Sequence, residues 1–351
     1  MGVEVQRALT RAGKTVHSVV IGGDHIHSDE FGLARVLTAS PHEPSLFLAV
    51  GSGTITDITR YISFRLGQPF ISVPTASSVD GFASMGSPLV IEGVKRTHMG
   101  HTPQAIFADT RVIATAPKIL TAAGFGDLLG KITATVRHSI AQADAVGRRQ
   151  QDAVELLFRS LIETGLCMIE FGESRPASGA EHHISHFWEM SMLRMGIATE
   201  LHGIQVGMAT VIVAEFYQKL RALSVNDAAQ LLKKRLPFRE VELTAEIRAA
   251  YGTASEAIIK DNTEYLKLTA DEQSTIAKRI TANWDEVLEI ARAVPEPEEV
   301  QSLLMKAGAP VDVTLLGLPA DQLKAGVRSA HSRRPPLLPL FQFPRWRRSG
   351  H

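Results

Sequence analysis

Three histidines stand within five positions of the stretch SRPASGAEHHISHFWEM, which covers residues 174–190. They are His182, His183 and His186, and an acid and a tryptophan lie beside them. Imidazole nitrogens serve as metal ligands and as proton donors and acceptors near neutral pH. His182 and His186 have the i,i+4 spacing that puts two residues on one face of a helix. Periodicity alone does not separate a ligand from a packed core histidine, so the cluster needs support from elsewhere in the chain.

Two further segments offer metal ligands. In AAGFGDLLGK, Asp127 is predicted to lie between a Gly-rich turn and an apolar helix, where capping the helix is the commoner use of an aspartate. In ELHGIQVGMATVIVAEF, His202 is predicted to begin another long apolar helix. One carboxylate and several imidazoles on separate helices form a set typical of divalent-metal sites.

The segment GSGTITD, residues 51–57, has the features of a phosphate-binding loop. It follows the apolar run SLFLAV and opens a helical pattern, so free backbone amides and the positive end of the helix dipole would point at a ligand. Gly51 and Gly53 would let a diphosphate approach the backbone. The third glycine of the common dinucleotide fingerprint is absent, which leaves a simple tight turn as the alternative.

The elements around this loop alternate between strand and helix patterns. Strands are predicted over HSVVIGG (17–23), SLFLAV (45–50) and PFISVPT (69–75), and Ser28 could cap the helix DEFGLARVLTA. The helix predicted over 51–67 carries a single apolar face and ends at a glycine; these residues are Ile55, Ile58, Ile62, Leu66 and Gly67. A β-α-β unit follows from this order. The polar stretch PTASSVDGFASMGSP comes after its second strand, where ligands bind in open α/β sheets.

Strand patterns end near Thr121, and helical patterns continue to about Ala330. The predicted division therefore lies near Pro117, with an α/β domain over 1–117 and a helical domain over 118–330. The tail 331–351 is rich in proline, arginine and aromatic residues and is predicted to be irregular.

Composition narrows the class of protein. The 351 residues include 37 basic and 37 acidic side chains, and a net charge of zero argues against a nucleic-acid partner and favours a small molecule. The single cysteine, Cys167, cannot form an internal disulfide. It lies in the apolar, helix-like run LLFRSLIETGLCMIEF, and its side chain is predicted to be buried. No apolar run approaches about 18 residues and no secretion signal is recognisable, so we predict a cytoplasmic protein without a membrane span.

Six segments in a fixed order resemble the glycerol-1-phosphate dehydrogenases. They are GSGTITD, SVPTASSVDGFAS, AIFADT, AAGFGDLLGK, SRPASGAEHHISHFWEM and LHGIQVGMAT. That family belongs to the superfamily of glycerol dehydrogenase, the iron-containing alcohol dehydrogenases and dehydroquinate synthase. The resemblance runs from about residue 13 to residue 330 and implies a dehydroquinate synthase-like fold. In that fold, an α/β nucleotide-binding domain with a Rossmann-like parallel sheet precedes an all-α metal-binding domain.

The resemblance also implies roles for particular residues. Asp127, His182 and His202 would hold one divalent ion, with zinc expected and nickel or iron as alternatives. Asp80, Asp127 and His186 would be catalytic and face the substrate, whereas His183 would point elsewhere and take no catalytic part. Lys131 and Arg175 each stand beside one of these motifs and could bind a substrate phosphate, with simple solvation at the surface as the alternative. NAD or NADP would lie at seven positions, namely Gly51, Gly53, Thr54, Asp57, Thr75, Ser78 and Ser84.

The implied reaction interconverts sn-glycerol 1-phosphate and dihydroxyacetone phosphate in a homo-oligomeric enzyme. A related polyol or alcohol dehydrogenase, a dehydroquinate synthase-like lyase and a truncated non-catalytic member are the alternatives. Compared with the family, a strand and helix before AGKTVHSVV are missing, the interval between Lys131 and Ser174 is shorter, and the tail differs.

Overall fold

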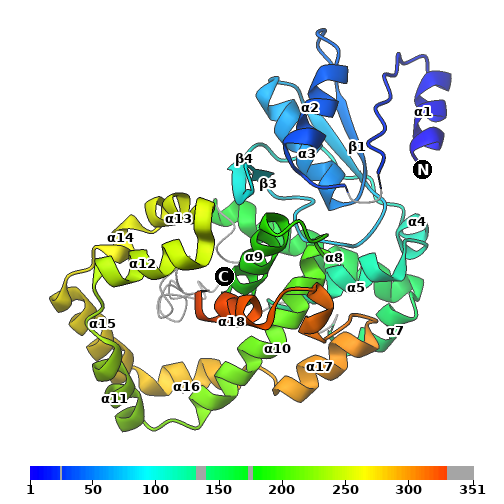
Figure 1. Ribbon diagram of the computed structural model, residues 1–351. Helices are drawn as coiled ribbons and strands as arrows, with labels where there is room; N and C mark the ends of the chain where they lie inside the picture. The colour runs from blue at the N-terminus through cyan, green and yellow to red at the C-terminus, as the bar shows by residue number, and fades with distance from the viewer. Residues whose placement is uncertain (24–25, 132–139, 173–176, 330–351) are drawn as a thin grey trace, which may run out of the picture.

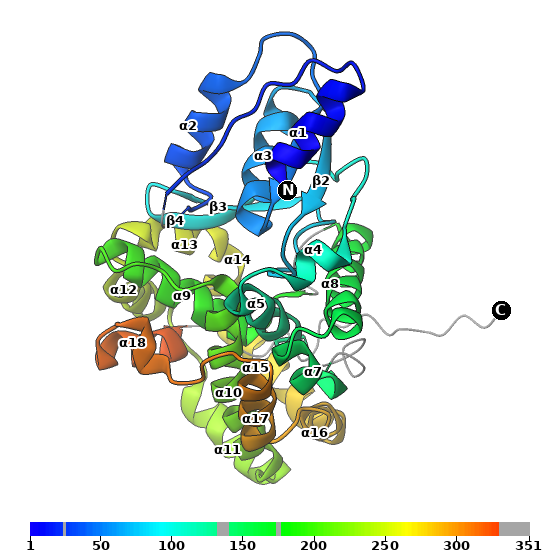
Figure 2. The same ribbon diagram turned by 90° about the vertical axis from the view of Figure 1, so that its right-hand side faces the viewer.

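The computed structural model describes residues 1–23, 26–131, 140–172 and 177–329. Within these ranges, every strand belongs to the N-terminal part of the chain, and the described residues after Pro117 form helices and connecting segments. Figure 1 shows the strands with α1, α2 and α3 on one side of the molecule and the helical part below them. The two parts meet where α9 (Ala180–Arg194) lies beside β4 (Val94–Met99), as Figures 1 and 2 show.

The predicted β-α-β unit is confirmed. Strand β1 (Phe47–Gly51) leads into α3 (Gly53–Arg65) and then into β2 (Phe70–Pro74), and β1 pairs in parallel with β2. The apolar face of α3 packs through Ile58 and Ile62 against α2 (Glu30–Ala39). At the end of the helix, Gly67 has φ +65°, a left-handed conformation that glycine adopts without strain. Leu66, also assigned to the apolar face, is 39% exposed, because it stands in the final turn of the helix beyond the packed residues.

Two predictions for the first 40 residues are wrong. Residues 17–22 form no strand, since no neighbouring strand supplies the hydrogen bonds that a strand needs. Of their side chains, Val20 is 74% exposed and Ile21 packs partly against the α2–α3 cluster. The cap of α2 is Asp29 rather than Ser28, because the Asp29 carboxylate accepts the Gly32 backbone N–H at 2.9 Å.

The polar stretch after β2 ends in a β-hairpin that sequence analysis missed. Strands β3 (Gly86–Ile91) and β4 (Val94–Met99) pair antiparallel, with Ile91 opposite Val94. Both turn residues have positive φ, 51° at Glu92 and 74° at Gly93, as a two-residue hairpin loop requires. The dipeptide Glu-Gly between two runs of β-forming residues was the available signal. It was overlooked because the polar residues before it indicated a loop.

The other described elements are helices. Four of them lie around the candidate site: α5 (Lys118–Leu129), α8 (Gln151–Phe171), α9 (Ala180–Arg194) and α10 (His202–Arg221). The other helices are α1 (Gly2–Arg11), α4 (Thr110–Ala114), α7 (Ala143–Gly147), α11 (Val225–Arg235), α12 (Glu240–Tyr251), α13 (Ser255–Asp261), α14 (Thr263–Leu266), α15 (Ala270–Ala282), α16 (Trp284–Arg292), α17 (Pro297–Lys306) and α18 (Ala320–Ser329), with short 3₁₀ helices at Gly252–Ala254 and Val313–Leu316. The largest hydrophobic core joins α5, α8, α9 and α10 to α17.

Helices α5 and α10 cross at very short range because glycines face each other. A Cβ on Gly203 would lie 1.9 Å from the Ala123 carbonyl oxygen, and one on Gly126 would lie 2.3 Å from the Gly203 carbonyl oxygen. The segment GFG is therefore part of helix α5, not the turn that we predicted before Asp127. Gly126 serves the packing against α10, while Gly124 allows close approach of the Ser77 carbonyl oxygen in the loop after β2. Asp127 occupies the C-terminal half of α5 instead of capping a helix.

We expect Gly203→Ala to destabilise the protein by about 1–3 kcal/mol, since the added methyl group forces the two backbones apart. Urea unfolding would measure the loss. Gly2→Ala in α1 is a matched control, because nothing lies within 4 Å of its Cβ position, and its effect should stay within about 1 kcal/mol. Equal effects of the two substitutions would contradict the tight crossing.

Cys167 lies in α8, as predicted, but its side chain is exposed and not buried in the core. The apolar face of α8 is formed by other residues, including Leu157 and Leu161. Among the described residues, no helix combines the length and the apolar character needed to cross a membrane.

Candidate active site

A cleft of about 550 Å³ opens where the strand-containing part meets the helical part. Its walls come from the start of α3, the loop after β2, the β3–β4 hairpin, α9 and the start of α10. Eight polar lining residues could take part in binding or catalysis: Asp57, Asp80, Ser84, Lys95, His182, His186, Glu189 and His202. Residues up to 236 positions apart in sequence, from Ile26 to Asn262, thus share one space.

Asp127, His182 and His202 converge beside this cleft. One potential ligand atom from each lies within 4.8 Å of the other two. Asp127 comes from α5, His182 from α9, and His202 is the first residue of α10. The Asp127 Oδ1 to His182 Nε2 distance is 3.3 Å, and the His182 and His202 ring centroids are 5.4 Å apart. The close α5–α10 crossing brings the carboxylate and the second imidazole together.

The protonation states of Asp127 and His202 suit a metal ion. Burial would lower the pKa of His182, but its hydrogen bonds to Asp127 and Glu181 outweigh burial and raise it, so an ion would displace a hydrogen from this ring. Burial lowers the pKa of His202 well below its usual value, so its ring is neutral, and its Nδ1 is buried without a hydrogen-bond partner among the described residues. Burial alone would raise the pKa of Asp127, but the Lys131 charge and the His182 hydrogen bond hold it well below the usual value. An ionised carboxylate with imidazole nitrogens is a donor set that a divalent ion accepts.

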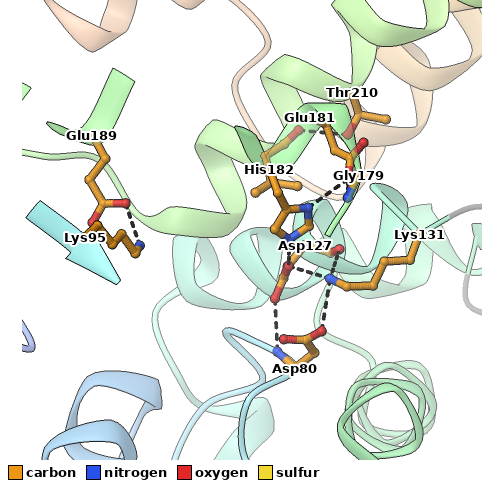
Figure 3. A network of polar contacts seen from close by, with 10 residues as sticks. Asp80, Lys95, Asp127, Lys131, Gly179, Glu181, His182, Glu189 and Thr210 are labelled. Atoms are coloured by element: carbon orange, nitrogen blue, oxygen red, sulfur yellow. Dashed lines mark hydrogen bonds and ion pairs between the residues drawn. The ribbon is translucent and has the colours of Figure 1, made fainter. Parts of the chain in front are cut away.

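Asp80 and Lys131 extend the polar network, as Figure 3 shows. The Lys131 ammonium lies 2.6 Å from Asp127 Oδ1 and 3.2 Å from Asp80 Oδ2, and the Asp80 backbone N–H donates to Asp127 Oδ2 at 3.0 Å. Burial lowers the pKa of Lys131, but the two carboxylates outweigh it and raise this pKa to about 12. Lys131 is therefore positively charged and points at the two carboxylates, and it is not part of the cleft wall.

Four of the seven residues predicted to bind the nucleotide lie at the cleft. Gly53, Thr54 and Asp57, in the first turns of α3, line the cleft together with Ser84. Gly51, Thr75 and Ser78 are not among the residues of its wall. Gly53 is buried, and a Cβ there would lie 2.5 Å from Val79 Cγ2, so packing within the chain already requires this glycine.

Arg60, which sequence analysis missed, ties α3 to the loop after β2. Its fully buried guanidinium donates to Asp57 Oδ1 at 2.9 Å and to the carbonyl oxygens of Gly81, Phe82 and Gly86 at 2.6, 3.1 and 2.9 Å. Its i,i+3 spacing from Asp57 was the available signal. Arg60 thereby holds the segment between Asp80 and the hairpin.

Burial raises the pKa of Asp57 from 3.8 to about 7, although Arg60 opposes this shift. The folded state then favours the protonated carboxyl, so the contribution of Asp57 to stability decreases as the pH rises from 3.8 to about 7.

Two more carboxylates were not identified from sequence. Glu189 of α9 forms an ion pair with Lys95 of β4 at 2.6 Å, which joins the hairpin to the metal-site helix. Glu181 contacts His182 Nδ1 at 2.8 Å. Both lie within one segment that was noted for its histidines, but helical spacing does not reveal their partners.

The remaining predicted positions are placed as follows. His186 lines the cleft, and its ring stacks on that of His202 with centroids 5.3 Å apart. His183 is buried and also contributes to the lining, although we expected it to point elsewhere. Arg175 and the tail 331–351 lie outside the described residues.

Comparisons with known proteins agree with the predicted fold. Residues 1–117 match the family model for iron-containing alcohol dehydrogenases. A similar solved structure is 2-epi-5-epi-valiolone synthase from Streptomyces hygroscopicus with NAD+ and Zn2+ bound; its TM-score is 0.57 at 15% identity, covering 95% of this chain and 78% of that one. At this identity the likeness concerns the fold, and it confirms the dehydroquinate synthase-like architecture.

Sequence relatives are closer. The glycerol-1-phosphate dehydrogenase of Geobacillus thermodenitrificans is 32% identical over 336 residues, covering 89% of this chain and 74% of the relative. The glycerol-1-phosphate dehydrogenase of Halalkalibacterium halodurans is 34% identical over 362 residues, covering 95% of this chain and 80% of the relative. Since both matches extend over most of each chain, the protein belongs to the glycerol-1-phosphate dehydrogenase family.

Proposed function

We propose that this protein interconverts sn-glycerol 1-phosphate and dihydroxyacetone phosphate with NAD or NADP and a divalent metal ion. The observation that carries the proposal is the cluster of Asp127, His182 and His202 beside a cleft that also contains the first turns of α3. Relatives named glycerol-1-phosphate dehydrogenase support the choice of substrate.

The chain's residues would divide the chemistry as follows. Asp127, His182 and His202 would hold the ion, which when bound supplies Lewis acidity toward the substrate oxygen. Zinc suits a site with three nitrogen and oxygen ligands and an open position, while nickel and iron are alternatives.

The remaining groups would bind and orient the reactants. Asp80 and His186 face the cleft, where they would position the hydroxyl groups of the substrate. Backbone amides at the start of α3, near Gly53 and Thr54, would bind the cofactor diphosphate at the positive end of the helix dipole. The buried surroundings of the cleft would limit competing access by water.

We propose Lys95 as a binding group for the substrate phosphate. Among the described residues that line the cleft, it is the only lysine or arginine. Its pairing with Glu189 holds the ammonium at the cleft wall. Lys131, by contrast, is directed at Asp127 and Asp80. Its positive charge would therefore act on the part of the substrate that lies nearest the metal ion.

The test follows the absorbance of reduced nicotinamide with dihydroxyacetone phosphate, dihydroxyacetone or no substrate, with and without added zinc. Charge-assisted hydrogen bonds to the phosphate should favour dihydroxyacetone phosphate by at least about tenfold in kcat/KM. Equal use of both ketones would favour a glycerol or polyol dehydrogenase. If neither ketone is reduced by the zinc-loaded protein with either nicotinamide, the non-catalytic alternative is favoured.

Lys95→Met sharpens this test, because it should reduce the preference for the phosphorylated ketone. Lys118→Met, at an exposed position in α5, is the matched control and should leave the preference unchanged. A preference that survives in Lys95→Met would assign the phosphate to other groups.

We also propose the division near Pro117 as the domain boundary, with domains over 1–117 and 118–330. The location of all described strands before Pro117, and of the cleft where the two parts meet, supports it. Homo-oligomerisation and a cytoplasmic location stay predictions from sequence.

A further inference from the structure

Glu181 is a buried carboxylate adjacent to a candidate metal ligand. It is the second residue of α9, only 5% exposed, and it directly precedes His182. Its Oε1 lies 2.8 Å from His182 Nδ1 and accepts the Gly179 backbone N–H at 2.8 Å. Figure 3 shows Glu181 on the side of the His182 ring that faces away from Asp127.

Two glycines make room for the Glu181 side chain. A Cβ on Gly130 would lie 3.1 Å from Glu181 Cγ, and a Cβ on Gly179 would lie 2.6 Å from Glu181 Oε2. The buried carboxylate is oriented by its two contacts, because Oε1 is directed at both the Gly179 backbone N–H and the His182 imidazole.

This contact determines which nitrogen of His182 carries hydrogen. An ionised carboxylate only accepts hydrogen bonds, so the ring must donate from Nδ1 to Glu181 Oε1. Nε2 of the same ring lies 3.3 Å from Asp127 Oδ1, within hydrogen-bond distance. When a cation takes the place of the hydrogen on Nε2, Nε2 and Asp127 Oδ1 can both bind it, while Nδ1 still donates to Glu181.

We propose that Glu181 is a positioning residue that fixes His182 as a metal ligand through Nε2. The inference rests on the metal site of the proposed function and adds a residue that acts on it indirectly. A carboxylate that accepts the second N–H of a ligating histidine fixes the tautomer and the ring orientation and increases the basicity of the ligand nitrogen. Among the described residues, the Nδ1 of His202 is buried without a partner, which leaves that nitrogen free to face the same ion.

Zinc affinity, measured by competition with a chromophoric chelator, tests the inference on the full chain. Glu181→Ala should weaken zinc binding by about 10- to 100-fold. Glu181→Gln should lose less, because its amide oxygen can still accept from His182 Nδ1 and Gly179 N. Glu189→Gln is the matched control on the same helix; its carboxylate binds Lys95, and its zinc affinity should change by about threefold or less.

A second measurement separates positioning from a structural role. In the zinc-loaded protein, a ¹H–¹⁵N correlation should place hydrogen on Nδ1 of His182 in the wild type and in Glu181→Gln. Cobalt substitution should give a visible spectrum in Glu181→Ala that differs from the wild type, while Glu189→Gln keeps the wild-type spectrum.

The outcomes are distinguishable. Zinc affinity that is unchanged in both Glu181 variants, or hydrogen found on Nε2 of His182, would overturn the positioning role while leaving the metal site intact. If Glu181→Ala does not fold, Glu181→Gln with unchanged affinity and without hydrogen on Nδ1 would do the same. A wild-type protein that binds no zinc or cobalt would remove both this inference and the metal-dependent function.

Discussion

Replacing His182 by alanine is expected to abolish stoichiometric zinc binding. The substitution removes one of three converging side chains, and it also leaves Glu181 and Asp127 without the imidazole that both contact. Replacing a residue that only hydrogen-bonds a metal ligand typically weakens metal binding by about 10- to 100-fold. Loss of the ligand itself should have a larger effect, so we expect zinc affinity to fall by more than about 100-fold. Metal content after gel filtration and chelator competition would measure it, and reduction of dihydroxyacetone phosphate should be lost in parallel.

His183→Ala is the natural control, because it removes the neighbouring imidazole of the same helix. Its zinc affinity should stay within about threefold of the wild type, since His183 is not part of the three-residue cluster. Circular dichroism of both variants would verify that α9 still folds. Equal metal content in the two variants would contradict the assignment of His182.

Arg60→Met is expected to destabilise the folded protein by about 3–5 kcal/mol, as is usual when one member of a buried ion pair is removed. Methionine keeps much of the volume but supplies no donor. Asp57 would lose its counter-charge, and the carbonyl oxygens of Gly81, Phe82 and Gly86 would lose their donors. Because this segment carries Ser84 and follows Asp80, NAD binding should weaken as well. Urea unfolding and calorimetry with NAD would measure the two effects.

Arg65→Met controls for the loss of positive charge on α3. Arg65 is exposed in the last turn of the same helix, so its replacement should change the free energy of unfolding by about 0.5 kcal/mol or less. The proposed role of Arg60 would be wrong if its substitution cost no more than that of Arg65.

Local signals predicted a large part of the fold. The apolar periodicity of α3, the glycine at its end and the apolar strands on either side predicted a β-α-β unit that the structure contains. These features depend on residues close in sequence, so a pattern can report them. The prediction over residues 17–23 was wrong because a strand exists only with a partner, and none of the described strands pairs with this segment. The β3–β4 hairpin was missed because polar residues preceded its one clear turn signal.

For the site, the sequence determined which chemical groups are present and the helices that carry most of them. Asp127, His182 and His202 could be proposed as ligands through their residue types and the ordered motifs around them. Only the tertiary structure decided that Asp127 lies inside a helix. Glycines that suggested a loop in the sequence, such as Gly126, instead allow α5 to pack closely against α10 at Gly203. The partners of the buried charges, Arg60 with Asp57, Glu189 with Lys95 and Glu181 with His182, were likewise decided by packing. Burial makes an unpaired charge costly, and which groups meet where water is excluded depends on how distant elements dock, which no local pattern records.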